Sequence, residues 1–317
     1  MVLFNYLFVS FQCTTLYGLG FIGSADNTLL ALRGNMEVIN RILDDYTDYS
    51  HQKLTEEFGT YSLGKYDPIY LYQRYKCRII DKKPRIALEA TDLVVPQIYQ
   101  SAYQEIISDI ESGNDLKKYQ SRNLKKLDYD DDMLSHWGIQ HFHLGQTLEN
   151  DGYVKRTGDL LFVHFSGTNA HILGFFNHGS WVDLDLIEIL HENWPQELAV
   201  FKSGSNAPPL TELEYKTLRK KHVNANVTVK DGTEYLCPGM GVAANGAPIF
   251  AVLNSDKVIF MFNRAFELIR ENVALILESD PEQRTSDTIT VGMEIVDSTR
   301  SVVYHIKETG FKFTLPS

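Results

Sequence analysis

Residues 137–144, WGIQHFHL, and residues 160–176, LLFVHFSGTNAHILGFF, decide the fold that we expect for this chain. Both stretches are rich in aromatic and β-branched residues, which favours strands. The residues Ser166-Gly167-Thr168-Asn169 are typical of a tight turn. We therefore predict a strand at 137–144 and a hairpin of two strands, 160–165 and 170–176. If the hairpin pairs with the first strand, polar groups from all three meet at one end of a small sheet.

The flanking segments mix helical and strand patterns. Apolar residues at helical spacing predict helices over 27–50, 95–110, 182–191, 211–222 and 259–278. Short strands are expected around Val227 and at 249–253, 288–296 and 302–306. No sustained alternation of strand and helix is present, so we predict an α+β fold with mixed helices and short, mainly antiparallel sheets.

Three regions follow from these patterns. They are a mixed N-terminal region (1–113), a histidine-rich β module with a helix (121–200) and an α+β C-terminal region (210–317). The charged segment 114–132 is interpreted as a linker or an exposed entry to the module. Thr211 and Glu214 are spaced as a capping box at the start of a helix.

The 317 residues carry a formal net charge of -11, which argues against broad nonspecific binding to DNA. Basic residues cluster at 117–126 and 216–221, and we interpret both clusters as solvated helix faces. The three cysteines lie far apart in the sequence, so we expect no disulfide framework. We expect a reducing, cytoplasmic location instead. No apolar run is long enough to span a bilayer, so a membrane partner is not expected.

Two features near the N-terminus carry little functional weight. Residues 18–23, GLGFIG, match the GxGxxG pattern of dinucleotide-binding folds, but the strand context is missing and a glycine-rich turn is favoured. Residues 1–13 are apolar and predict a core strand, or alternatively sequence upstream of a start near Met36.

Histidines are concentrated in the module. Seven of the ten histidines lie between residues 136 and 191, at positions 136, 141, 143, 164, 171, 178 and 191. His141 and His143 have strand spacing and face the same side of a sheet. Arg156 precedes the hairpin, and His178 and Trp181 follow it.

Two kinds of chemistry would use this set. In one, His141, His143 and a third imidazole bind a metal ion with Glu149 as a further ligand, which loosely resembles the cupin arrangement without its glycine and proline spacing. In the other, no metal is needed. One histidine takes a proton from a ribose 2′-hydroxyl, another histidine or Arg156 steadies the phosphate, and an aromatic ring stacks on a base.

The stretch from Tyr153 to Trp181 resembles the core hairpin of RelE-type messenger-RNA endonuclease toxins. In that family an arginine-bearing strand and a turn lead to an apolar strand that ends in a basic residue and an aromatic. The resemblance implies that Arg156 and His178 are phosphate and acid/base groups and that Trp181 stacks on a base. The chain departs from the family in its length and its acidic charge. Residues 137–145, WGIQHFHLG, also resemble a motif of uncharacterised bacterial proteins, which implies no mechanism.

The leading hypothesis is a metal-independent ribonuclease without a cofactor, of toxin or phage-defence type. Its expected partners are RNA and a protein inhibitor or antitoxin. The candidate catalytic residues are His141, His143, Arg156 and His178, and the candidate substrate-binding residues are Lys155 and Trp181. One alternative is a metal-dependent enzyme that uses His141, His143 and Glu149. Another is a non-catalytic interaction module whose histidines are structural.

Overall fold

The computed structural model describes residues 37–177, 179, 183–204, 208–282 and 286–315. These residues form helices and mostly antiparallel sheets, which confirms the predicted α+β class. The chain divides into two compact units. Unit 1 combines Met1–Tyr72 with Ser255–Ser317, and unit 2 is Gln73–Asn254. The expected module at 121–200 lies within unit 2, whereas the expected regions 1–113 and 210–317 contribute residues to both units.

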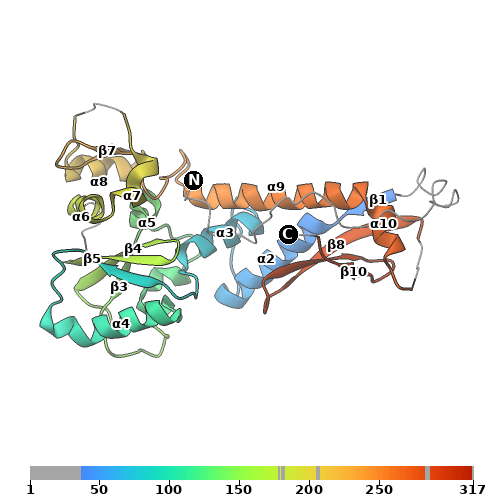
Figure 1. Cartoon of the computed structure of the whole chain (residues 1–317), viewed down its shortest axis with the longest axis horizontal. Helices are drawn as coiled ribbons and strands as arrows, with labels where there is room; N and C mark the ends of the chain where they lie inside the picture. The colour runs from blue at the N-terminus through green and yellow to red at the C-terminus, as the bar shows by residue number, and fades with distance from the viewer. Residues whose placement is uncertain (1–36, 178, 180–182, 205–207, 283–285, 316–317) are drawn as a thin grey trace. The chain divides into compact units, whose positions relative to one another are not determined.

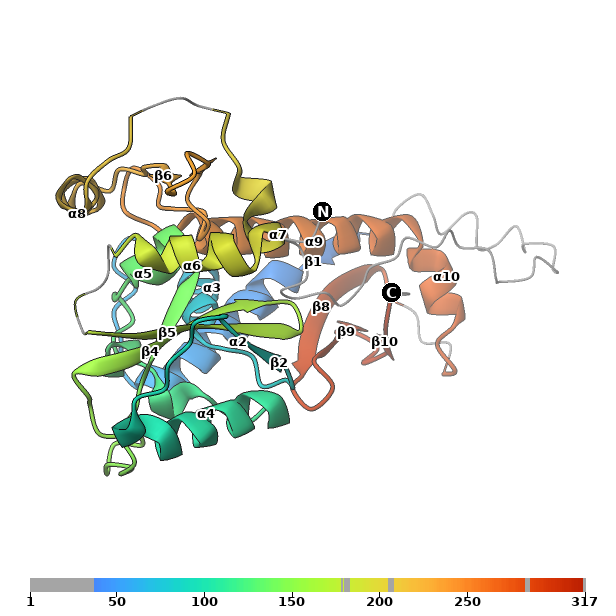
Figure 2. The same cartoon turned by 60° about the vertical axis from the view of Figure 1, so that its left-hand side comes forward.

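Unit 2 is built on a four-stranded sheet with the strand order β2-β5-β4-β3. Its strands are β2 (Ile86–Glu89), β3 (Ile139–His143), β4 (Asp159–Ser166) and β5 (Asn169–Asn177). The β4–β5 hairpin closes where Ser166 pairs with Asn169, as the turn chemistry predicts, and β3 pairs antiparallel with β4. The predicted hairpin is therefore confirmed, and one of its strands, β4, pairs with the first strand. The sheet is seen in two orientations in Figures 1 and 2.

Helices cover both faces of this sheet (Figures 1 and 2). Helix α4 (Gln100–Ser112) packs its buried apolar residues against Phe142, Leu161 and Ile172 on one face. On the other face, α5 (Asp132–Trp137) and α6 (Asp185–Asn193) pack against Leu160 and Phe162. The alternation of strand side chains separates the two cores, because successive residues point to opposite faces.

Smaller elements complete unit 2. They are η1 (Gln97–Tyr99), η2 (Lys117–Tyr119), η3 (Arg122–Lys125), α7 (Pro195–Leu198), η4 (Ala199–Phe201), α8 (Glu212–Lys220), β6 (Val227–Thr228) and β7 (Glu234–Tyr235). The capping box of Thr211 and Glu214 is present at the start of α8. The segment 114–132 is not the exposed linker that its charge suggested. Its apolar residues Leu116, Tyr119 and Leu124 are buried and fasten it to the unit.

Unit 1 contains a second sheet with the order β1-β8-β9-β10. Its strands are β1 (Glu37–Asn40), β8 (Thr288–Val296), β9 (Ser301–Ile306) and β10 (Lys312–Phe313). Its core also draws on α2 (Ile42–Phe58), α9 (Ile249–Glu271), α10 (Val273–Glu278) and the first residues of α3 (Pro68–Arg78). β1 runs parallel to β8, and β9 is antiparallel to both of its neighbours.

Two secondary-structure predictions were wrong here. Residues 249–253 form the first turn of α9 rather than a strand, because a five-residue apolar run does not distinguish a strand from a buried helix start. Val38 and Ile39 lie in β1 rather than in the helix expected over 27–50, since they pair with β8 far along the chain. Among the described helices, none combines the length and apolar character needed to cross a bilayer. The GLGFIG turn and the strand expected at 1–13 lie outside the described residues.

Candidate functional site at the His143 end of the unit 2 sheet

Four histidines share one face of the unit 2 sheet. His141 and His143 lie on β3, His164 on β4 and His171 on β5. The register pairs His164 with His171 directly, and it pairs His141 and His143 with Phe162 and Leu160 of the same β4 face. The prediction that His141 and His143 face the same side of a sheet is confirmed. The four imidazoles nevertheless fall into two separate settings.

His164 and His171 belong to the core. The His171 ring lies 4.6 Å from the Trp194 ring between centroids and 5.9 Å from the His164 ring. Nδ1 of His164 is 3.0 Å from the carbonyl oxygen of Gly138, and Nε2 of His171 is 3.4 Å from Oε1 of Glu197. Burial lowers the pKa of His171 to about 4 and also lowers the pKa of His164. Both are therefore neutral core histidines at pH 7.

The other two described histidines of the seven also lie elsewhere. His136 is buried in α5, with Nδ1 3.9 Å from Sγ of Cys237. Burial lowers the pKa of His136 to about 4 and raises the pKa of the Cys237 thiol, which is the opposite of an activated thiolate–imidazolium pair. Nδ1 of His191 is 2.7 Å from the Tyr235 hydroxyl and Nε2 is 3.2 Å from Oδ2 of Asp231, which joins α6 to the β6–β7 hairpin.

His141 and His143 mark a different place, along β3 toward its end. Their ring centroids are 6.4 Å apart, and their exposed fractions are 4% and 3%. Nδ1 of His141 is 3.8 Å from Oδ2 of Asp131, beside a cavity of about 10 Å³ that is also lined by Arg78. A cavity of that size holds about one water molecule and no nucleotide base. The space beside His141 is therefore too small for a substrate, and His143 is buried to the same extent.

The end of the sheet brings together several of the predicted groups. His143 is the last residue of β3, and it pairs with Leu160, while Asp159 pairs with Asn177 at the last position of β5. Lys155 and Arg156 are exposed and lie just before β4. His178 and Trp181 lie outside the described residues, but Asn177 carries the chain to this same edge. The register thus brings His143 and Asn177, the residue before His178, to the same end of the sheet, and Arg156 lies three residues before β4 begins at that end.

Comparison with family models, curated proteins and solved structures gave no match.

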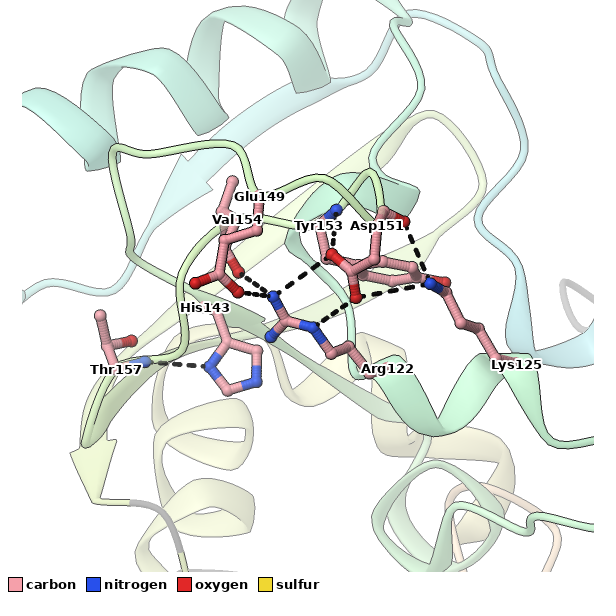
Figure 3. A network of polar contacts seen from close by, with 8 residues as sticks. All are labelled: Arg122, Lys125, His143, Glu149, Asp151, Tyr153, Val154 and Thr157. Carbon is pink, nitrogen blue, oxygen red and sulfur yellow. Dashed lines mark hydrogen bonds and ion pairs between the residues drawn. The ribbon is translucent and has the colours of Figure 1, made fainter.

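The loop between β3 and β4 covers His143 and carries a polar network that the sequence did not reveal (Figure 3). The backbone N–H of Thr157 donates to Nδ1 of His143 at 3.4 Å. Nε of Arg122 donates to Oδ2 of Asp151 at 2.7 Å, and Nη2 of Arg122 contacts the Glu149 carboxylate. The hydrogen bond from Arg122 holds the pKa of Asp151 at about 2. Arg122 of η3 thus binds the two carboxylates of this loop and ties the loop to η3.

Glu149 has a different partner from the one that the metal alternative requires. Its carboxylate is bound to Arg122 rather than directed at the His141–His143 pair. Within the described part of the chain, no three His, Cys, Asp or Glu side chains are grouped as a metal site would need.

The sequence pattern indicated a solvated helix face for Arg122 and Lys125. It therefore did not predict their ion pairs with this loop. The one available signal was the acidic pair Glu149 and Asp151 in a loop between two strands that bear histidines. Two nearby acidic residues alone do not predict a network, because their partner Arg122 comes from an earlier part of the chain.

Proposed function

We propose that unit 2 is a metal-independent endoribonuclease of toxin or phage-defence type, with its site at the His143 end of the sheet. One observation carries the proposal. The strand register brings His143 of β3 and Asn177 of β5 to the same end of the sheet, where β4 begins three residues after Arg156. Imidazole and cationic side chains together are what cleavage of RNA through its own 2′-hydroxyl requires.

The proposed chemistry is a transesterification within the RNA strand. A neutral imidazole takes the proton from a 2′-hydroxyl, whose oxygen forms a bond to the adjacent phosphorus. The bond from phosphorus to the 5′-oxygen breaks, and a second, protonated imidazole donates a proton to that oxygen. The products are a 2′,3′-cyclic phosphate and a 5′-hydroxyl, so atoms and charge balance without a co-reactant.

His143 and His178 are the proposed acid/base pair. Nδ1 of His143 accepts the Thr157 N–H, so the neutral ring carries its proton on Nε2, and Nδ1 becomes the base only when this hydrogen bond is released. Arg156 and Lys155 would hold the phosphate, and Trp181 would stack on a base. His141, which lies deeper along β3 beside Asp131, is a positioning residue in this scheme.

The test is cleavage of single-stranded RNA by the purified full-length chain in the presence of EDTA. Wild type is compared with His143→Gln, Arg156→Ala and His178→Ala, and with His51→Gln as a matched control. His51 is an exposed histidine on α2 of unit 1, so its loss removes an imidazole without touching the proposed site. General acid–base groups typically contribute about 10²–10⁴-fold, so the two site histidine variants should lose at least 10²-fold in rate.

The products decide between mechanisms. A 2′,3′-cyclic phosphate end formed in EDTA, lost in His143→Gln and kept in His51→Gln, supports the proposal. Cleavage only after a divalent metal is added would replace it with the metal-dependent alternative. No cleavage under either condition, with the fold intact by circular dichroism, would leave the interaction module as the function.

A further inference from the structure

The β3–β4 loop is a narrow ribbon whose two arms lie against each other. The N–H of Lys155 donates to the carbonyl oxygen of Thr147 at 2.8 Å, and the N–H of Glu149 donates to that of Tyr153 at 2.8 Å. Gly145 permits the close approach at the base, because a Cβ there would lie 2.1 Å from the carbonyl oxygen of Lys155. The ribbon therefore presents its tip, with Glu149 and Asp151, as a defined structure.

The tip is seated on two cations. Arg122 contacts both carboxylates and also donates to the carbonyl oxygen of Val154 at 3.3 Å. Nζ of Lys125 lies 3.4 Å from Oδ2 of Asp151 and donates to the Asp151 carbonyl oxygen at 3.1 Å. Figure 3 shows the Glu149 and Asp151 side chains turned toward the Arg122 guanidinium, with Lys125 approaching Asp151 from the other side.

An aromatic ring lies beneath the two cations. The Arg122 guanidinium carbon is 5.8 Å from the Tyr153 ring centroid, and Nζ of Lys125 is 5.0 Å from it. Guanidinium and ammonium groups bind phosphate as they bind carboxylate, and the guanidinium does so through two parallel hydrogen bonds. The carboxylates that now fill it are partly solvated, with side-chain exposures of 47% for Glu149 and 34% for Asp151. An external anion can therefore reach the same cations.

We propose that Arg122 and Lys125, over the Tyr153 ring, form a binding site for an RNA backbone phosphate, and that Glu149 and Asp151 occupy it in place of the phosphate when RNA is absent. This inference rests on the proposed ribonuclease function and deepens it. The same loop carries Thr157, whose N–H contacts His143. Displacement of the acidic tip by RNA thus loosens the segment that covers the proposed catalytic imidazole.

RNA binding tests this site separately from catalysis. The probe is a fluorescein-labelled, single-stranded 2′-O-methyl RNA, which lacks the attacking hydroxyl and is not cleaved by the proposed chemistry. Its fluorescence anisotropy is measured with the full-length chain at a fixed salt concentration of about 50 mM, because phosphate contacts are strongly salt-dependent.

The informative variants change the tip and the cations independently. Glu149→Gln with Asp151→Asn removes the competing carboxylates and should tighten RNA binding on the order of fivefold. The matched control is Glu294→Gln with Asp297→Asn in unit 1, which alters the net charge equally at exposed ion pairs. Arg122→Gln with Lys125→Gln should weaken binding and reduce its salt dependence by about two phosphate contacts.

Each result has a defined meaning. Tighter binding by the tip variant alone, with loss in the cation variant, supports the site. If the tip and control variants bind RNA more tightly by the same factor, the effect is one of net charge, and the proposed site is overturned. Absence of binding by wild type and tip variant alike would also overturn it. Binding as expected together with no cleavage of unmodified RNA would keep the site and reject the ribonuclease function. Cleavage without a tip effect would keep the function and reject the site.

Discussion

The imidazole of His171 packs against the indole of Trp194 at an interplanar angle of 54°, with ring centroids 4.6 Å apart, and no part of His171 is exposed to solvent. A histidine in such a place is useful to the fold only while it is neutral. Its charged form would have to be desolvated, with Glu197 as the nearest carboxylate.

Unit 2 should therefore lose stability in mild acid. The pKa of His171 is lowered to about 4 in the folded chain and is ordinary, near 6.5, in the unfolded chain. Between pH 6.5 and pH 4 this histidine is protonated in the unfolded chain but not in the folded chain. The free energy of unfolding is therefore highest above pH 6.5, and it falls as the pH drops toward 4. A shift of this size corresponds to about 3 kcal/mol. His136, whose pKa is also lowered to about 4, adds to the effect.

This loss is measured by denaturant unfolding at pH 7 and pH 5. Tryptophan fluorescence reports unit 2 alone, because Trp137, Trp181 and Trp194 all fall within it. His171→Leu should flatten the pH dependence, whereas His51→Leu at an exposed position should leave it unchanged. Equal midpoints for wild type at the two pH values would contradict the assignment of neutral core histidines.

Gly145→Ala should distort the ribbon over His143. The added Cβ would lie 2.1 Å from the carbonyl oxygen of Lys155, so the backbone must shift, and overpacking of this kind costs about 1–3 kcal/mol. Gly158→Ala is the matched control, because a Cβ there meets nothing within 4 Å. Hydrogen exchange of amides in residues 145–157 should speed up in the first variant and stay unchanged in the second. The opposite order would show that the ribbon is not held at Gly145.

Thr211→Ala should destabilise α8 by removing its capping box. The Thr211 hydroxyl accepts the Glu214 N–H, and the Glu214 side chain accepts the Thr211 N–H. Loss of such a cap costs about 1 kcal/mol. Thr217→Ala in the same helix removes a hydroxyl that donates only to the carbonyl of Leu213, and it should be neutral or slightly stabilising. Urea unfolding of both variants tests this, and equal losses would argue against the cap.

Cys77 and Cys237 should resist alkylation in the native chain at pH 7. Burial raises the pKa of Cys77 to about 11 and raises that of Cys237, so little thiolate is present at either position. Iodoacetamide labelling followed by mass spectrometry of the two cysteine peptides measures this. Both should react only after denaturation, and labelling of native Cys237 within minutes would indicate an activated thiol beside His136.

The sequence predicted what depends on neighbours in the chain. The β4–β5 hairpin follows from the turn Ser166–Asn169, and the common face of His141 and His143 follows from strand spacing. It did not reveal what depends on distant partners. Val38 and Ile39 are in a strand only because β8 pairs with them, and Arg122 matters only because the tip of a later loop folds onto it. Apolar periodicity carries no information about either contact.

The histidine-rich composition predicted one cluster of imidazoles, whereas the structure separates them into several settings. Seven imidazoles in one module suggested a cluster. His171 instead packs against Trp194 and His164, while His136 and His191 contact other elements. Strand spacing fixes which face a side chain takes. It does not fix whether that face is covered by helices, as it is here by α5 and α6.

The parallel pairing of β1 with β8 has a consequence for synthesis on the ribosome. Glu37 pairs with Thr288, so β1 has no partner strand until β8 has been synthesised. Unit 2 is continuous from Gln73 to Asn254, so its described strands have all been synthesised before β8 of unit 1. Domains fold as units during translation. We therefore expect unit 2 to fold first, while β1 of unit 1 remains unpaired until β8 has been made.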